Sequence, residues 1–213
     1  MTSNAPAPDP QARALLDEPP LGLRERKKRR TREAIRREAY RLFREQGYDA
    51  TTIEQIAEAA EVSPSTFFRY FPTKEDVVLT DEYDPVIERL IRESPADRTF
   101  IETLRSAVIG PLKVLMETER EEMVTRMQLL VSVPALQARS AQQQTEGWRL
   151  LADLYAERTG RSRADRHLRY AAAAVGGALN EAMLAWAEAG CVGSPSEVME
   201  DALDFLESAL SGY

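Results

Sequence analysis

Residues 51–74 read TTIEQIAEAAEVSPSTFFRYFPTK, and this stretch predicts two short helices joined by a tight turn. Two pairs at its start, Thr51 with Glu54 and Thr52 with Gln55, have the spacing of a capping box, in which side chains satisfy free backbone N–H groups. Apolar residues then recur at helical spacing, which predicts one buried face on the first helix. These residues are Ile53, Ile56, Ala57 and Ala60.

The second helix of this stretch follows the turn. Ser63 is placed to cap it, and Pro64 stands at the first helical position, where its missing N–H costs nothing. Phe67 and Phe71 lie four residues apart and are expected to point inward, and Pro72 ends the helix. Two short helices joined in this way form a helix-turn-helix, whose second helix can enter the major groove of DNA.

Charge separates this part of the chain from the rest. Residues 24–74 hold 13 basic and 8 acidic side chains, a net charge of +5, whereas the whole chain carries −7. A basic module on an acidic body indicates that one end faces a polyanion. The densest basic run is RERKKRR, residues 24–30. It either lies along phosphates or in a minor groove, or it is a solvated, frayed terminus, and both interpretations stay open.

Residues 35–79, IRREAYRLFREQGYDATTIEQIAEAAEVSPSTFFRYFPTKEDVVL, resemble the DNA-binding domain of the tetracycline-repressor (TetR) family of transcriptional regulators. The matching features are Phe43, Gly47 and Tyr48 before the threonines, the Thr-Ile-x-x-Ile-Ala helix and the Tyr-Phe-x-x-Lys-Glu ending. Phe68 departs from the pattern, because the family usually carries Tyr there. A hydroxyl that could reach a phosphate is therefore absent at this position.

The helix-turn-helix offers two kinds of DNA contact. Polar or charged side chains on the second helix are expected at base edges, and apolar ones at a thymine methyl. These base-contact candidates are Ser65, Thr66 and Arg69, with Pro64 and Phe68 for the apolar contact. Other side chains are expected to hold phosphates and so to set the register on the duplex. The phosphate candidates are Thr51, Thr52, Ser63, Tyr70 and Lys74.

The whole chain predicts an all-α fold with three segments. Residues 1–22 are expected to be a disordered extension, because they hold five of the twelve prolines. Residues 23–74 are expected to form a three-helix DNA-binding domain, and residues 75–213 a helical effector-binding and dimerisation domain. Its predicted helices cover residues 74–91 with a break at Asp84-Pro85, 97–119 with a bend at Gly110-Pro111, 121–133, 134–159, 163–189 and 196–210.

The resemblance implies that this body holds an effector and that its last two helices pair with a second subunit. The small and apolar residues expected at that interface are Ala171, Ala174, Ala178, Leu203, Leu206 and Leu210. The segments PALQAR and LNEAMLAWAEAG are similar to regulators with an acyl-CoA-type ligand domain, such as the mycofactocin-system regulator. The effector is therefore expected to be elongated and largely apolar.

Nine residues of the body are candidates for that effector site. Methionine-rich interiors adapt to varied ligands, although simple core packing is the favoured interpretation for most of these side chains. The candidates are Phe100, Leu104, Arg105, Val108, Met123, Arg126, Met127, Leu130 and Trp148, with the two arginines for an anionic head group.

The sequence offers little for catalysis or for metal binding. His167 is the only histidine, Cys191 the only cysteine, and no Cys-x-x-Cys pair exists, so we expect no metal site, no cofactor and no enzyme. A single cysteine cannot form an internal disulfide, which favours a reducing compartment. The sequence also lacks an apolar run of about 18 residues and a signal-peptide core, so we expect a cytoplasmic protein without membrane partners. The expected partners are a palindromic operator in double-stranded DNA, a small-molecule effector and a second copy of the chain.

The predicted function is a dimeric, ligand-responsive transcriptional regulator, more often a repressor than an activator, that a small apolar effector releases from its operator. Two rival functions remain open. One is a constitutive or architectural DNA-binding protein with a solid core and no effector. The other is a small-molecule-binding or catalytic helical protein in which the helix-turn-helix pattern is accidental.

Overall fold

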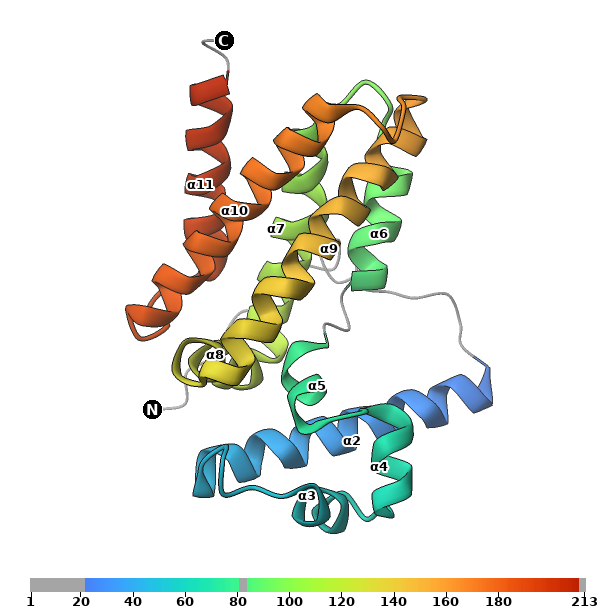
Figure 1. The fold of residues 1–213 in the computed structure, drawn as a ribbon, viewed down its shortest axis with the longest axis vertical. Coiled ribbons are helices and arrows are strands. Elements are labelled where there is room, and N and C mark those ends of the chain that lie inside the picture. The colour runs from blue at the N-terminus through green and yellow to red at the C-terminus, as the bar shows by residue number, and fades with distance from the viewer. Residues whose placement is uncertain (1–21, 81–83, 211–213) are drawn as a thin grey trace. The chain divides into compact units, whose positions relative to one another are not determined.

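The computed structural model describes residues 22–80 and 84–210, and within these ranges the chain forms helices and no strands (Figure 1). The predicted all-α fold is therefore confirmed. Apart from Gly22, the predicted disorder of residues 1–22 concerns residues outside these ranges. The helices are α2 (Leu23–Gln46), α3 (Ile53–Ala59), α4 (Pro64–Tyr70), α5 (Lys74–Leu79), α6 (Asp84–Glu93), α7 (Phe100–Thr118), α8 (Arg120–Ser132), α9 (Pro134–Thr159), α10 (Arg166–Glu188) and α11 (Pro195–Leu210).

Several helices begin at the caps that the sequence predicts. Of the two possible boxes before α3, the structure forms the one between Thr52 and Gln55. Ser63 caps α4 as predicted, with Pro64 in the first turn, and the structure also has a cap at Thr73, before α5. Because these caps satisfy N–H groups that a helix start leaves free, they fix where each short helix begins. At the end of α2, Gly47 has a φ of 88°, a conformation that glycine adopts without a steric penalty.

Prolines mark helix boundaries in the rest of the chain, and only the bend predicted at Gly110-Pro111 stays untested. α5 ends at Leu79 and α6 begins at Asp84, so the helix predicted over residues 74–91 is interrupted, but before Asp84-Pro85, which form the start of α6. α6 ends at Glu93, immediately before Ser94-Pro95. α7 continues through Pro111, which is buried, and the bend expected there stays a prediction.

The described chain forms two compact units. The HTH unit contains residues 22–80 and 121–140, and the body unit contains residues 84–120 and 141–210. Within the body unit, α10 lies beside α11 (Figure 1). The predicted domain division at residues 74 and 75 does not coincide with these units, because residues 121–140 group with the helix-turn-helix.

The core of the HTH unit joins its helices to the distant segment 121–140. Ile35 and Ala39 of α2 are fully buried together with Phe67 of α4. Leu136, from the first turn of α9, is also fully buried in this cluster. The apolar face predicted for α3 is present as well, because Ile56 is fully buried here. Burial of this kind contributes about 1.5–3 kcal/mol for each large apolar side chain.

The body unit has its own core, built on α7, α9, α10 and α11. Leu104, Leu179 and Leu203 are at most 1% exposed. Leu203 and Leu206 were chosen for the subunit interface because a single subunit was expected to leave them poorly covered. That expectation is wrong, because both pack into this core. No helix in the described part of the chain is long and apolar enough to cross a membrane.

Candidate nucleic-acid interface

The scaffold of the interface is α4, which two aromatic side chains anchor to the HTH unit. Phe67 and Phe71 are 0% and 1% exposed, and their ring centroids are 6.0 Å apart. At the start of the helix, the Ser63 hydroxyl accepts a hydrogen bond from the Thr66 N–H at 3.1 Å. The two anchors and the cap fix the axial rotation of α4, so its remaining side chains form a defined surface.

The side chains predicted to contact bases lie on that surface. Pro64, Ser65, Phe68 and Arg69 are exposed, and Thr66 is half-buried. Phe68, an apolar ring, is 50% exposed and lies edge-on to the Phe67 ring, with the two centroids 5.8 Å apart. The structure thus brings all five candidates together on one short helix.

A cluster of hydroxyl groups lies at the N-terminus of α4. The Ser63 oxygen is 2.9 Å from the Ser65 oxygen and 3.0 Å from the Thr66 oxygen. Hydroxyl groups both donate and accept, so this cluster can present either function to a base edge or a phosphate. At the other end of the helix, the Arg69 guanidinium lies 5.5 Å from the centroid of the half-buried Tyr70 ring.

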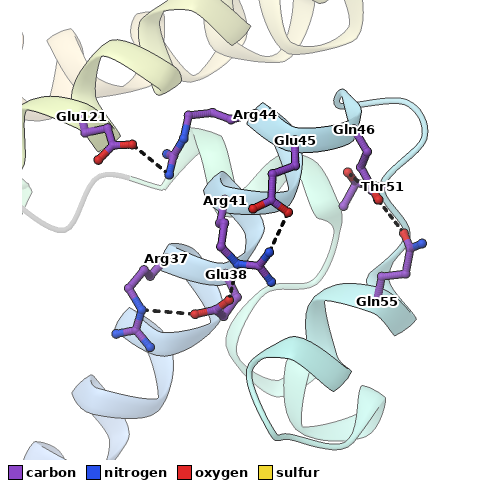
Figure 2. A network of polar contacts seen from close by, with 9 residues as sticks. All are labelled: Arg37, Glu38, Arg41, Arg44, Glu45, Gln46, Thr51, Gln55 and Glu121. Carbon is purple, nitrogen blue, oxygen red and sulfur yellow. Dashed lines mark hydrogen bonds and ion pairs between the residues drawn. The ribbon is translucent and has the colours of Figure 1, made fainter.

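Two of the predicted phosphate contacts have internal partners instead. Thr51 is only 1% exposed, and its hydroxyl donates to the Gly47 carbonyl at 2.7 Å. The same oxygen accepts a hydrogen bond from Gln46, which also donates to Gln55 (Figure 2). Burial argues against a phosphate role for Thr51. Thr52 remains exposed, although its hydroxyl caps α3.

Lys74 is the second predicted phosphate contact that has internal partners. Its ammonium group donates to the carbonyls of Tyr48 and Thr51, at 2.7 and 3.0 Å, and lies 4.2 Å from the centroid of the Tyr48 ring. An ammonium group has three donors, and two of them are used within the protein. The role that the geometry favours for Lys74 is therefore to hold the turn before α3, and not to bind a phosphate.

Tyr48 itself is a buried phenol in this turn. Burial raises the pKa of its hydroxyl, and the nearby Glu75 carboxylate raises it further. Tyr48 therefore stays neutral over the physiological range, and its ring serves as the apolar wall of the Lys74 contact.

Two arginines hold α5 at its two ends; the sequence analysis did not single out Arg139, and it assigned Arg126 to an effector head group. Arg139 donates to the Thr73 hydroxyl and to the Asp76 carboxylate, both at 2.8 Å. Arg126 donates to the Val78 carbonyl at 2.9 Å. The partners in these contacts are 66, 63 and 48 residues apart in the sequence, so no local pattern could predict them.

The arginines in the second half of α2 are engaged in ion pairs. Arg41 contacts Glu38 at 2.8 Å and Glu45 at 2.6 Å, and its hydrogen bond lowers the pKa of Glu38 (Figure 2). Arg44 contacts Glu121 of α8 at 3.0 Å, and Arg36 contacts Glu122 at 3.1 Å. Because these cations are compensated, the basic excess of the unit lies elsewhere.

The predicted effector residues fall into both units. Phe100, Leu104, Arg105, Val108 and Trp148 belong to the body unit, and Met123, Arg126, Met127 and Leu130 belong to the HTH unit. Leu104 is fully buried in the body core, and Leu130 packs against the core of the HTH unit.

Both arginines chosen for an anionic head group already have protein partners. Arg105 contacts Asp204 at 2.7 Å and Glu207 at 3.1 Å, and Arg126 donates to Val78 as above. These contacts argue against the head-group role. Within the described residues, no group of three or more His, Cys, Asp or Glu side chains is arranged to hold a metal ion.

Two capped short helices, a buried anchor and an exposed second helix define a helix-turn-helix protein. Residues 35–80 match the family model for bacterial regulatory proteins of the TetR family, and residues 98–211 match the model for the MftR C-terminal domain. The second match alone covers more than half of the chain. This chain belongs to the TetR family of bacterial regulatory proteins, with a C-terminal domain of the MftR type.

Individual relatives agree with this assignment. The HTH-type transcriptional regulator TcmR of Streptomyces glaucescens is 38% identical over 146 residues, which cover 65% of this chain and 65% of TcmR. HbdR of Aromatoleum sp. (strain CIB) is 42% identical over 59 residues, 25% of this chain and 26% of HbdR. The chain thus spans less than two thirds of these relatives' lengths.

Among solved structures, Thermus thermophilus FadR, a TetR-family transcriptional repressor in complex with lauroyl-CoA, is similar in fold. It is 28% identical, with a TM-score of 0.53, and the match covers 82% of this chain and 92% of FadR.

Proposed function

We propose that this protein is a DNA-binding transcriptional regulator that binds a palindromic operator as a homodimer and is released by a small, largely apolar effector. The observation that carries the proposal is the surface of α4: five side chains suited to reading DNA are displayed on a helix that is capped and anchored by buried phenylalanines. Family membership and the regulator names of the relatives support it. This function requires no catalytic group and operates in the cytoplasm.

Arg69 is the side chain on which this proposal is most directly tested. It is exposed near the C-terminal end of α4, where an arginine can donate two hydrogen bonds to a guanine edge. DNA sites are first selected from a random library with the purified protein. Arg69→Ala is then expected to weaken binding to the selected operator by about 1–3 kcal/mol and to relax the preference at one base position in each half-site.

A matched control for this experiment is Arg149→Ala. Arg149 is an exposed arginine of α9 in the body unit, so its loss should leave both affinity and sequence preference unchanged. If Arg69→Ala weakens all sequences alike, Arg69 binds a phosphate. If the parent protein selects no sequence at all, the proposed function fails.

The proposed homodimer rests on α10 and α11. Tyr170 of α10 is 64% exposed and Phe205 of α11 is 70% exposed, which leaves large apolar side chains in water on both helices. Ala174 of α10 is also exposed. Burying such side chains against a second copy contributes favourable free energy, and a two-fold axis makes the contact self-complementary.

The effector proposal is supported by relatives more than by local geometry. The MftR-type domain and the lauroyl-CoA complex of Thermus thermophilus FadR favour an acyl-CoA. An effector of this kind would act by binding one state of the regulator more tightly than the other. The rival function, a constitutive DNA-binding protein with a solid core, is favoured by the full burial of Leu104 and by the partners of Arg105.

A further inference from the structure

The first turns of α2 carry an excess of positive charge. Residues 22–30 are all exposed, and the first buried side chain of the helix is Ile35. Five cations of this segment, Arg24, Arg26, Lys27, Lys28 and Arg30, make no ion pair or side-chain hydrogen bond with any residue of the described ranges. The arginines of the second half of α2 are engaged in ion pairs (Figure 2).

This segment is helical, and it projects beyond the reading helix. Arg32 marks the limit of the packed part, because its guanidinium stacks 4.8 Å from the centroid of the Phe71 ring at the end of α4. At a rise of 1.5 Å per residue, the nine helical residues before Arg32 extend about 13 Å further. In Figure 1, the blue start of α2 lies beyond α4 in the same unit.

The helical repeat places four of these five cations on two faces of α2. Lys28 lies four residues before Arg32 and seven before Ile35, and Arg24 lies four before Lys28. Arg24 and Lys28 therefore continue the face on which α2 packs against α3 and α4. Arg26 and Arg30 lie about 200° around the helix from Arg24 and Lys28, on the other side.

We propose that the N-terminal turns of α2 form a second, sequence-independent DNA contact, in which Arg24 and Lys28 bind phosphates that flank each half-site. This inference rests on the proposed function and extends it. Phosphates outside the base-reading surface are the anions that an overhanging cationic helix beside α4 would meet. A lipid surface fits less well, because Leu23 is the only large apolar side chain among residues 22–32, and an interfacial helix needs an apolar face.

The test compares two double variants with equal loss of charge. Arg24→Gln with Lys28→Gln removes the proposed contacts, and Arg26→Gln with Arg30→Gln is the control. Glutamine has nearly the helix propensity of arginine and lysine, so circular dichroism should show unchanged helix content. Binding to the selected operator is measured over a range of salt concentrations. Each phosphate contact contributes about 0.9 to the slope of log K against log salt, so the first variant should lower its magnitude by about 2 per subunit.

The control variant should keep the parent slope. Hydroxyl-radical footprints should agree: Arg24→Gln with Lys28→Gln loses protection of backbone positions outside the half-sites, and the control does not. Base preference within the half-sites should be the same in all three proteins, because α4 is untouched.

Three outcomes would overturn the inference while leaving the regulator function intact. An unchanged slope for both variants means that the segment touches no DNA. Equal reductions of the slope in both variants mean that the segment attracts DNA through its overall charge, without contacts from particular side chains. Binding to phosphatidylserine vesicles that depends on Arg24 and Lys28, with an unchanged operator slope, assigns the segment to a membrane. By contrast, a parent protein without any operator preference contradicts the proposed function itself.

Discussion

Lys74 shows how a cation in a DNA-binding unit can serve the fold alone. Its ammonium group bonds two carbonyls of the turn before α3 and is half-buried. Hydrogen bonds to a charged group contribute about 1.5–3 kcal/mol, so Lys74→Ala is expected to lower the free energy of unfolding by about that amount. The salt dependence of operator binding should not change, because no phosphate contact is lost.

Urea unfolding and salt-dependent binding of the same preparation check this expectation. Lys113→Ala is the control, since Lys113 makes only an exposed ion pair with Glu200 and should cost about 1 kcal/mol or less. A stable Lys74→Ala protein whose salt slope falls by about one per subunit would instead restore the phosphate role.

Gly176 is a residue whose missing side chain matters. A methyl group at this position would lie 2.2 Å from the Trp148 ring, an approach that real contacts essentially never show. An indole is rigid and half-buried here, so Trp148 or α10 would have to move. We expect Gly176→Ala to destabilise the body unit by about 1–3 kcal/mol, reduced by the better helix propensity of alanine.

The neighbouring glycine of α10 provides the comparison for this variant. A methyl group at Gly177 would meet no atom within 4 Å beyond its chain neighbours and the backbone of its own helix. Gly177→Ala should therefore gain up to about 1 kcal/mol from helix propensity. Thermal unfolding monitored by Trp fluorescence should move in opposite directions for the two variants. A shift in the same direction would mean that Trp148 does not lie against Gly176.

At the scale of elements, α5 is held at its two ends by the distant segment 121–140. Arg139 binds the capping box of α5, and Arg126 binds a carbonyl in its last turn. Arg139→Ala should cost about 1.5–3 kcal/mol of local stability, because two charge-assisted hydrogen bonds are lost. Arg139→Lys should recover only part, since an ammonium group lacks the fork that bonds Thr73 and Asp76 together.

Hydrogen exchange of the α5 amides measures this effect where it occurs. Faster exchange in Arg139→Ala, an intermediate rate in Arg139→Lys and the parent rate in Arg149→Ala are expected. Unaltered α5 exchange in all three would show that the capping box between Thr73 and Asp76 suffices without Arg139.

The elements could be predicted from sequence because their signals are local. Ser63 with Pro64 determines the start of α4, and Pro134 begins α9, each within one turn of the residues involved. The inward direction of Phe67 and Phe71 likewise follows from their spacing in a single helix.

Contacts over long sequence distances could not be predicted in this way. Nothing near Lys74 in the sequence shows that its ammonium group bonds the carbonyls of Tyr48 and Thr51, which lie 26 and 23 residues earlier. Similarly, the pattern of residues 121–140 indicates helices but not which core buries Leu136. The phosphate candidates were therefore judged by residue type alone, and the burial of Thr51 could be learned only from the structure.

At the scale of the whole molecule, the proposed dimer determines the spacing of the two half-sites in the operator. Two copies of α4 related by a two-fold axis would meet half-sites about 34–36 Å apart on one face of the duplex. The Arg24 and Lys28 contacts would then flank both half-sites. An effector that favours one separation of the two reading helices changes affinity only through its different affinities for the two states.

The identity of the effector can be tested by the release of the protein from its operator. We expect acyl-CoAs to release the protein from its operator, with potency that rises as the chain lengthens from octanoyl- to lauroyl- to palmitoyl-CoA. Each methylene that becomes fully buried contributes about 0.8 kcal/mol, or roughly a fourfold gain in affinity, which is an upper bound for each added carbon. Free coenzyme A is the control and should not release the operator, because it lacks the apolar chain.

An Arg105 variant tests the head-group role in the same titration. Because Arg105 is paired with Asp204 and Glu207, Arg105→Ala should leave the dependence on chain length unchanged. A loss of acyl-CoA response in Arg105→Ala, with operator binding intact, would restore its head-group role and require those ion pairs to open. If no acyl-CoA releases the operator at any chain length, the acyl-CoA proposal fails. The buried body core around Leu104 would then favour the constitutive regulator, whose operator affinity depends on no ligand.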